Sequence, residues 1–195
     1  MGTTAPRLDV LAPLSGWLVP LDSVPDPVFA GKMVGDGISL DPTSGSLLAP
    51  VAGVVSNLHS AHHALTITTA EGVEVMVHIG IDTVMLKGEG FFPLVEQGQQ
   101  VSAGQAVIDF DIDQVGRRAA SLLTQIIVTN GDSVHSMQPA QGMVNAGRDV
   151  VLSLTLANGQ AAAQVQSGEP QLSAAIAIGN PAGLHARPAA VFASK

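Results

Sequence analysis

VEVMVHIGIDTVMLKGEG, residues 73–90, begins as an alternating β-branched run and reaches a single histidine, His78, before a Gly-rich turn. The run predicts a strand in which the neighbours of His78 point to the opposite face. His78 shares its face with Met76 and Gly80, and we expect Gly80 to leave room beside the imidazole. An unperturbed imidazole is largely neutral at pH 7, so one ring nitrogen has a free lone pair for nucleophilic attack or metal binding. The structural alternative is a half-buried His that donates to a backbone carbonyl.

A second strand, ALTITTA at 64–70, precedes this run and joins it through Glu71-Gly72, as in a hairpin. With the tip of the hairpin at this turn, His63 lies directly opposite His78. Directly opposite residues face the same side with Cβ atoms about 4.5–5.5 Å apart, so the two imidazoles converge on a metal or on a transferred group. Three other histidines are interpreted as surface or structural residues: His59, His62 and His135.

The composition favours a β protein with many turns. The 195 residues include 21 Gly and 12 Pro, and 46% are hydrophobic while only 12% are charged. A net charge of −8 without a basic stripe excludes a nucleic-acid partner, and the absence of Cys excludes disulfides and thiol chemistry. No run approaches the ~18 apolar residues of a membrane span, and the N-terminus has no secretory signal. We therefore expect a soluble, cytoplasmic protein that does not span a membrane.

The segment LAPLSGWLVPL at 11–21 recurs as LAPVAGVVSNL at 48–58, and both read L-A-P-x-x-G-x-h, where h is apolar. The recurrence predicts two copies of one β unit packed against each other. One helix is expected at 111–123, capped by Asp111 or Asp113. We predict an all-β domain built as a sandwich or barrel-like sheet. Further strands are expected at 99–111, 123–130 and 148–158.

The β pattern stops at Asn158. Residues 158–171 are small and polar without an apolar period, as in a flexible linker. The order restarts with a strand at 172–178, a turn and the start of a helix that reaches Lys195. Roughly 24 residues cannot bury a core of their own, so we expect this chain to end inside a second domain.

VHIGIDTVMLKGEGF at 77–91 resembles the signature of the glucose-type IIA component of the bacterial phosphoenolpyruvate-dependent sugar phosphotransferase system. The resemblance covers residues 8–157 and implies a IIA phosphotransferase domain over 1–157. It also implies the IIA β-sandwich or barrel-like fold with its duplicated hybrid motif. The flanking motifs that match in order are APLSG at 12–16, VPDPVFAGKMVGDGISLDPTSG at 24–45, APVAGVV at 49–55 and NGDSV at 130–134.

The resemblance implies a role for three residues. His78 is the phosphorylated nucleophile, His63 stabilises the phosphoryl group, and Asp82 is a nearby orienting or electrostatic group. For Asp82, an ordinary turn residue after Gly80 is the alternative.

An apolar collar around His78 is expected to bind partner proteins, although each of its residues could equally belong to the core. Two positions depart from the family pattern. Ala61 stands where many relatives have a hydroxyl residue, and Met85 stands where an acidic residue is common. The collar residues are Val28, Phe29, Met33, Val34, Leu65 and Met76.

GNPAGLHARPAAVFASK at 179–195 resembles the start of HPr, the phosphocarrier protein of the same system, through its G-L-H-x-R-P-A motif. The family's phosphorylated His corresponds to His185 and its supporting Arg to Arg187. His185 stands just before a helix with Pro188 in its first turn, so free backbone N–H groups would point at a phosphate there. Residues 172–195 are therefore expected to be the incomplete start of an α/β HPr-like domain.

The order IIA, linker, HPr resembles the multiphosphoryl transfer proteins, in which enzyme I follows and the whole chain is a phosphoenolpyruvate-protein phosphotransferase. The implied route runs from phosphoenolpyruvate through enzyme I, His185 and His78 to a IIB domain of a membrane permease for glucose or N-acetylglucosamine. A linker of roughly 14 residues raises the effective concentration of the two sites toward millimolar. No cofactor is implied for this part of the chain, and magnesium is expected only for enzyme I.

Two other classes of protein fit parts of the sequence. A zinc-dependent hydrolase could use His63, His78 and Asp82, although neither H-E-x-x-H nor H-x-H occurs. Zinc could also bind adventitiously to His63 and His78 alone. A biotinyl- or lipoyl-like carrier module fits LAPVAGVV and GQQVSAGQAVI, but its Met-Lys-Met or Asp-Lys-Ala motif is missing.

Overall fold

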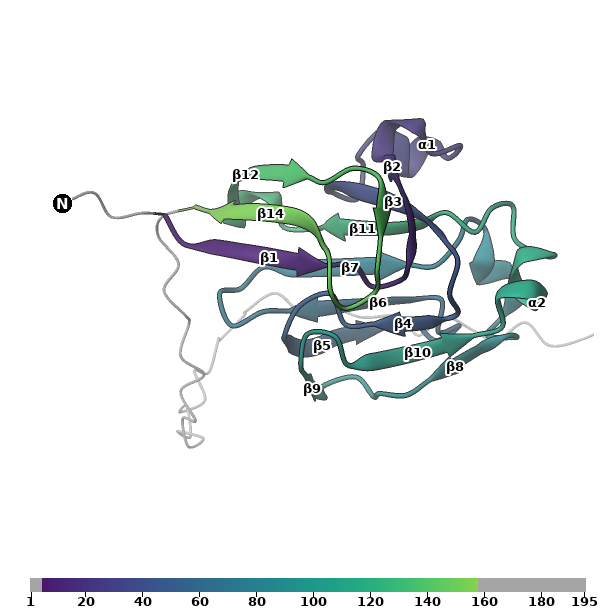
Figure 1. Ribbon diagram of the computed structural model, residues 1–195. Helices are drawn as coiled ribbons and strands as arrows, with labels where there is room; N and C mark the ends of the chain where they lie inside the picture. The colour runs from purple at the N-terminus through teal and green to yellow at the C-terminus, as the bar shows by residue number, and fades with distance from the viewer. Residues whose placement is uncertain (1–4, 158–195) are drawn as a thin grey trace, which may run out of the picture. The chain divides into compact units, whose positions relative to one another are not determined.

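Residues 5–157, which the computed structural model describes, form three antiparallel sheets (Figure 1). The largest has eight strands in the order β13-β2-β3-β11-β7-β6-β5-β9, and the two smaller ones have the orders β1-β14-β12 and β4-β10-β8. The predicted all-β class is therefore confirmed for this part of the chain. The strands are β1 (Arg7–Leu11), β2 (Gly16–Pro20), β3 (Asp36–Pro42), β4 (Ser46–Leu48), β5 (Gly53–Leu58), β6 (Ala64–Thr68), β7 (Glu74–His78), β8 (Phe91–Pro93), β9 (Gln100–Val101), β10 (Ala106–Phe110), β11 (Thr124–Val128), β12 (Val134–Pro139), β13 (Met143–Val144) and β14 (Val150–Leu156).

Helical segments in the described residues are short. The helix expected at 111–123 forms only as α2, Ile112–Gly116, where the Asp111 carboxylate caps it by accepting from two backbone N–H groups. It stops early because the chain beyond it pairs with another segment: Ile81 N donates to Ser121 O and Ala120 N donates to Ile81 O. The remaining segments are α1 (Pro27–Ala30) and the 3₁₀ turns η1 (Leu21–Ser23), η2 (Thr83–Leu86) and η3 (Gly131–Ser133).

The strand orders divide into two matching units. One unit is β4–β10, continuous in sequence, and the other consists of β1–β3 followed by β11–β14. Each unit supplies one three-stranded sheet, β4-β10-β8 or β1-β14-β12, and one half of the large sheet, β7-β6-β5-β9 or β11-β3-β2-β13. The two units meet where β7 pairs with β11.

The repeated sequence motif begins the same strand in each unit. Gly16 opens β2 and Gly53 opens β5. A Cβ at Gly16 would lie 2.0 Å from the carbonyl oxygen of Asp41, and one at Gly53 would lie 2.3 Å from that of Thr68. Both glycines thus permit a close approach of two backbones, and the prediction of two packed copies is confirmed.

Burial alternates along β7, and this alternation places His78 on the face of the strand that points away from the main core. Val75 and Val77 are fully buried in the main core, whereas Met76 and His78 on the other face are half-buried. That face is covered by a small second cluster that includes Phe29 of α1. In Figure 1, α1 lies at the edge of the molecule beside β2 and β3.

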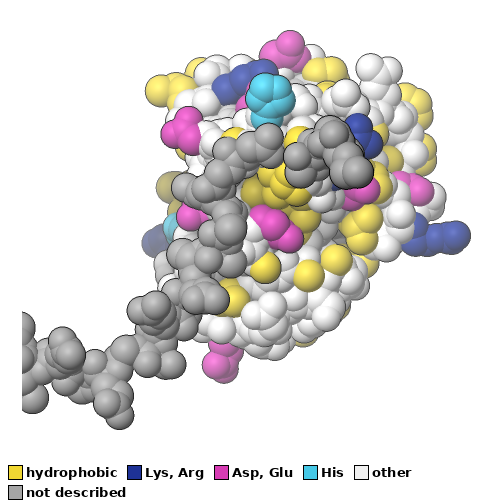
Figure 2. Space-filling model, turned by 90° about the vertical axis from the view of Figure 1, so that its left-hand side faces the viewer, with side chains coloured by type: hydrophobic (Ala, Val, Ile, Leu, Met, Phe, Trp, Pro, Cys, Tyr) yellow, Lys and Arg dark blue, Asp and Glu magenta, His cyan; other side chains and the backbone are white. Residues whose placement is uncertain are grey.

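None of the helices in the described part of the chain has the length and apolar character that a membrane crossing requires. On the face seen in Figure 2, basic side chains are few and separated from one another, in keeping with the net charge of −8.

Candidate functional site

The β6–β7 hairpin has a register one residue away from the prediction. His78 pairs with Ala64, not with His63, and the strands are joined by the five residues 69–73. This odd loop is fixed by Gly72 at φ 81° and by the Asn130 side chain, which donates to the Gly72 carbonyl. The prediction that His63 lies directly opposite His78 is therefore wrong.

The two rings nevertheless meet. His63 stands one position before β6, where the left-handed backbone of His62 at φ 54° turns the chain, and Ile79 N donates to the His63 carbonyl at 2.8 Å. The ring centroids of His63 and His78 lie 4.7 Å apart at 82°. The convergence of the two imidazoles is thus produced by the turn that precedes the strand.

Gly80 fixes the tautomer of His78. The Gly80 backbone has φ +70°, and its carbonyl lies 2.9 Å from His78 Nδ1. A carbonyl oxygen only accepts, so Nδ1–H donates and the neutral ring keeps its lone pair on Nε2. A Cβ at Gly80 would lie 2.6 Å from Thr83 Cγ2 and 2.9 Å from the Ser121 carbonyl. The space that Gly80 leaves therefore accommodates the turn. We had expected this space to lie beside the imidazole.

The surroundings keep His78 neutral. Burial lowers the pKa of the His78 imidazole below its ordinary value, while its hydrogen bond to the Gly80 carbonyl acts in the opposite direction. The ring lies between His63 and the Phe29 ring, whose centroid is 5.1 Å away. At neutral pH the site therefore presents a half-buried, neutral imidazole with its lone pair on Nε2.

His63 is the most deeply buried of the site histidines. It is 3% exposed, and its Nδ1 has no hydrogen-bond partner among residues 5–157. Burial lowers the pKa of His63 to about 4, and the charges of His78 and His59 act in the same direction. Ala61, where many relatives have a hydroxyl residue, offers this ring no side-chain partner.

Three residues of the site were missed by sequence reasoning. His59, interpreted above as a surface or structural residue, places its ring 4.4 Å from that of His63. Asp26 caps α1 and is the carboxylate that raises the pKa of His78. Gln125 pairs with His78 in the β7–β11 ladder and is fully buried. Of these three residues, only His59 had a signal in the sequence, because it precedes His63 by four residues.

Asp82 lies on the turn after His78 with an exposed side chain. Its backbone is left-handed at φ 59°, a conformation that Asp tolerates better than most residues, and its carboxylate does not cap η2. The structure thus places Asp82 at a strained position beside the site, while the carboxylate whose charge raises the pKa of His78 is that of Asp26.

The residues expected to form the apolar collar divide into two groups. Val28, Met33 and Val34 are exposed around α1, and Met76 is half-buried beside His78. Phe29 is largely buried with its ring against His78. Leu65 is a correction: at 1% exposure it belongs to the main core, because β6 turns this side chain to the face opposite His78.

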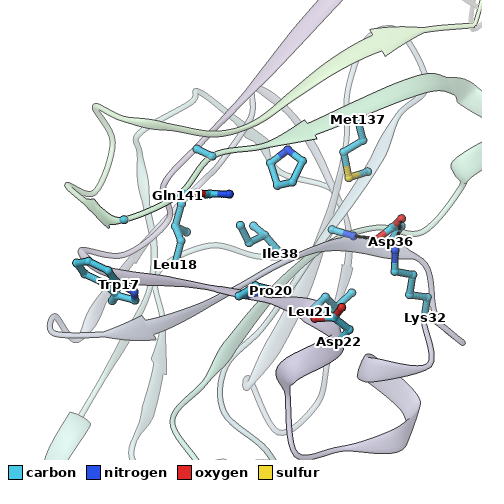
Figure 3. A pocket seen from close by; sticks show the side chains of 14 residues that line it. Trp17, Leu18, Pro20, Leu21, Asp22, Lys32, Asp36, Ile38, Met137 and Gln141 are labelled. Atoms are coloured by element: carbon cyan, nitrogen blue, oxygen red, sulfur yellow. Dashed lines mark hydrogen bonds and ion pairs between the residues drawn. The ribbon is translucent and has the colours of Figure 1, made fainter.

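A hollow of about 770 Å³ lies between β2, β3 and β12 (Figure 3). Trp17 stands at one end and the Lys32–Asp36 ion pair at the other, with Leu18 and Ile38 between them. None of the five histidines within residues 5–157 lines it. The candidate site at His78 and this hollow are therefore separate.

Metal binding by a set of three ligands is not supported in the described region. Among residues 5–157, no three His, Asp or Glu side chains are arranged so that they could hold a metal ion together. The predicted HPr-type residues His185 and Arg187, and the linker at 158–171, lie outside the described residues.

Residues 8–134 match the family model described as phosphoenolpyruvate-dependent sugar phosphotransferase system, EIIA 1. The glucose-specific EIIA component of Haemophilus influenzae is 42% identical over 148 residues, which are 76% of this chain and 89% of that protein. The glucose-specific EIIA component of Bacillus cereus is 38% identical over 157 residues, 80% of this chain and 95% of that protein.

The fold is also similar to a solved structure, that of glucose permease IIA from Mycoplasma capricolum. The TM-score is 0.73 at 39% sequence identity, and the match covers 78% of this chain and 99% of that one. The comparisons support neither the hydrolase nor the biotinyl- or lipoyl-like carrier.

Proposed function

The chain belongs to the EIIA 1 family of the phosphoenolpyruvate-dependent sugar phosphotransferase system, and on this basis we propose that His78 is the residue that carries the phosphoryl group. A phosphocarrier role in sugar uptake follows from the family itself. The assignment to His78 rests on one observation: its Nδ1–H donates to the Gly80 carbonyl, so the free lone pair is on Nε2.

The transfer is an in-line exchange between two imidazoles. The Nε2 lone pair of His78 attacks the phosphorus of a phosphohistidine on HPr, a P–N bond forms, and the P–N bond to the donor breaks with its electron pair returning to the donor ring. Positioning and charge stabilisation dominate such a step. His63, 4.7 Å away between ring centroids, supplies an N–H to the phosphoryl oxygens. In the next step, an acceptor residue of a IIB domain attacks the phosphorus and the P–N bond to His78 breaks. No cofactor is needed for either step.

The partner surface is the exposed apolar face of α1 and η2 beside His78. Val28, Met33 and Val34 lie on the α1 side, and Val84 and Met85 on the η2 side. Asp26 and Asp82 stand among these apolar residues as candidate contacts for basic side chains of HPr or IIB. This placement lets either partner bring its own phosphorylated or acceptor residue to Nε2. We assign the reaction to the cytoplasm, with a glucose- or N-acetylglucosamine-class permease as acceptor.

We further propose that residues 172–195 begin an HPr-like domain and that enzyme I follows in the complete protein. The G-L-H-x-R-P-A motif with His185 and Arg187 supports this assignment. Labelling of a longer chain that contains the whole HPr-like domain tests it: phosphate on His185 is expected, and transfer to His78 without external HPr should follow.

The experiment for His78 is incubation of the chain with enzyme I, HPr and ³²P-labelled phosphoenolpyruvate, followed by peptide mapping. Acid-labile label on His78 is expected, and His78→Ala should remove it. His135→Ala is the matched control, because His135 is exposed on β12 outside the site and should not affect labelling. Label that persists in His78→Ala, or its absence from the unaltered chain, would disprove the assignment.

A further inference from the structure

Hydrogen bonding explains only part of the orientation of the His63 ring, because an interaction with the Ala61 backbone leaves one ring nitrogen unpaired among the described residues. Its Nδ1 is buried without a partner among the described residues, although a histidine ring is normally oriented by a hydrogen bond of this kind. The residue is 3% exposed, so water cannot readily replace the missing partner. Packing against neighbouring rings must therefore help to hold this ring.

Three aromatic rings contact His63. The His59 centroid is nearest at 4.4 Å and 64°, His78 follows at 4.7 Å, and Phe91 lies at 6.5 Å. His78 is the phosphoryl acceptor in the proposed function and must itself adjust to the phosphoryl group. His59 and Phe91 are thus the neighbours that can hold the His63 ring by packing, and His59 is the closer of the two.

His59 is itself held firmly by its own turn. Its Nδ1 accepts from Ala61 N–H at 3.1 Å, so the neutral ring has its proton on Nε2. Its backbone N–H donates to the Ala64 carbonyl at 2.9 Å, and its carbonyl accepts from His62 N–H at 2.8 Å. A residue fixed by one ring and two backbone hydrogen bonds can transmit a defined position to a neighbouring ring whose Nδ1 has no partner.

We infer that His59 is a positioning residue for phosphoryl transfer, which orients His63 toward the phosphoryl group on His78 by ring packing. The inference rests on the proposed function for its catalytic consequence. The contact with His63 requires an aromatic ring at position 59, whereas the hydrogen bond to Ala61 requires an acceptor. Two substitutions separate these requirements: His59→Phe keeps the ring without the acceptor, and His59→Asn keeps an acceptor without the ring.

The first readout is the rate at which phospho-HPr labels His78. His59→Phe is expected to stay within a few-fold of the unaltered chain, and His59→Asn to fall about 10-fold, as expected for a displaced catalytic group. Equal rates for all three chains would overturn the inference. A slow His59→Phe with a normal His59→Asn would also overturn it, because the turn and not the ring would then be the important feature.

The second readout needs no phosphoryl donor and so separates this inference from the proposed function. Long-range ¹H–¹⁵N spectra of the unphosphorylated chain report the tautomer of His63. One dominant tautomer is expected in the unaltered chain and in His59→Phe, and a mixture in His59→Asn. An unchanged His63 spectrum in His59→Asn would contradict positioning, even if the rates differed.

Discussion

The two β units have the same strand order, but only one brings two histidines together. His78 is the last residue of β7, and His63 stands just before β6. At the corresponding places of the other unit are Val128, the last residue of β11, and Gly35, just before β3. The registers also correspond, because the first residue of β3 pairs with Val128 as the first residue of β6 pairs with His78.

The backbone explains why a second site could not form at Gly35. A Cβ there would lie 2.2 Å from the Val128 carbonyl oxygen, so no side chain can be accommodated. The segment between β2 and β3 instead contains α1, which places Phe29 against His78 and brings the Asp26 carboxylate near it. One unit therefore supplies the histidines of the site, and the other supplies the Phe29 ring and the Asp26 carboxylate next to them. The duplicated strands are a scaffold, and the chemistry lies in the segments that join them.

The largest expected effect comes from removing His63, which has no equivalent in the other β unit. His63→Ala should lower the rate of His78 labelling by about 10²–10³-fold, because a donor to the developing phosphoryl charge is lost. His63→Gln, which keeps an N–H donor, should retain part of the rate. A labelling rate unchanged in His63→Ala would show that the pairing of the two rings has no catalytic meaning.

A smaller effect is expected at Gly80, where the turn of the functional unit fixes the tautomer. Gly80→Ala must relieve contacts with Thr83 and Ser121 at a positive φ, which should cost more than about 1 kcal/mol in the free energy of unfolding and slow labelling about 10-fold. Gly98→Ala is the control, since Gly98 has φ +88° and no neighbouring atom within 4 Å. If both variants label alike, backbone strain alone matters and the Gly80 carbonyl has no special role.

The equivalence of the two units can be tested by chemical denaturation. Gly16→Ala and Gly53→Ala should each lower the free energy of unfolding by about 1–3 kcal/mol, because each new Cβ must displace a backbone carbonyl. Gly131→Ala, with open space around it, should have little effect. Tolerance of one substitution but not the other would show that the repeated motif does not have the same packing in both units.

The functional unit should also show a dependence of stability on pH. The pKa of His63 is lowered from 6.5 to about 4 in the folded chain, so between these values the unfolded chain binds more protons. Stability should therefore fall as the pH falls from about 6.5 toward about 4, and His63→Gln should weaken this trend. Urea midpoints measured across this range provide the test, and an equal slope in both chains would contradict it.

Much of this architecture could be predicted from the sequence. The recurrence of L-A-P-x-x-G-x-h revealed the duplication, because Gly16 and Gly53 meet a backbone carbonyl at the same place in each unit. Alternation along β7 predicted which face carries His78. The pairing register could not be predicted, since an odd loop stabilised by the distant Asn130 shifts it by one residue.

The environment of the site was less predictable for the same reason. The role of Gly80 depends on Thr83 and on the Ser121 carbonyl, which pairing with a remote segment brings there. Burial of Leu65 follows from the actual register. His59 gave no periodic signal, because it lies in a turn and not on a strand face.

The position of the phosphoryl group on the His78 ring tests the central claim most directly. Long-range ¹H–¹⁵N correlation spectra of the phosphorylated, ¹⁵N-labelled chain distinguish the two ring nitrogens. Because Nδ1–H donates to the Gly80 carbonyl, phosphorus should be bonded to Nε2 and Nδ1 should keep its proton. A phosphoryl group on Nδ1 would contradict the tautomer, the role of Gly80 and the proposed geometry of transfer.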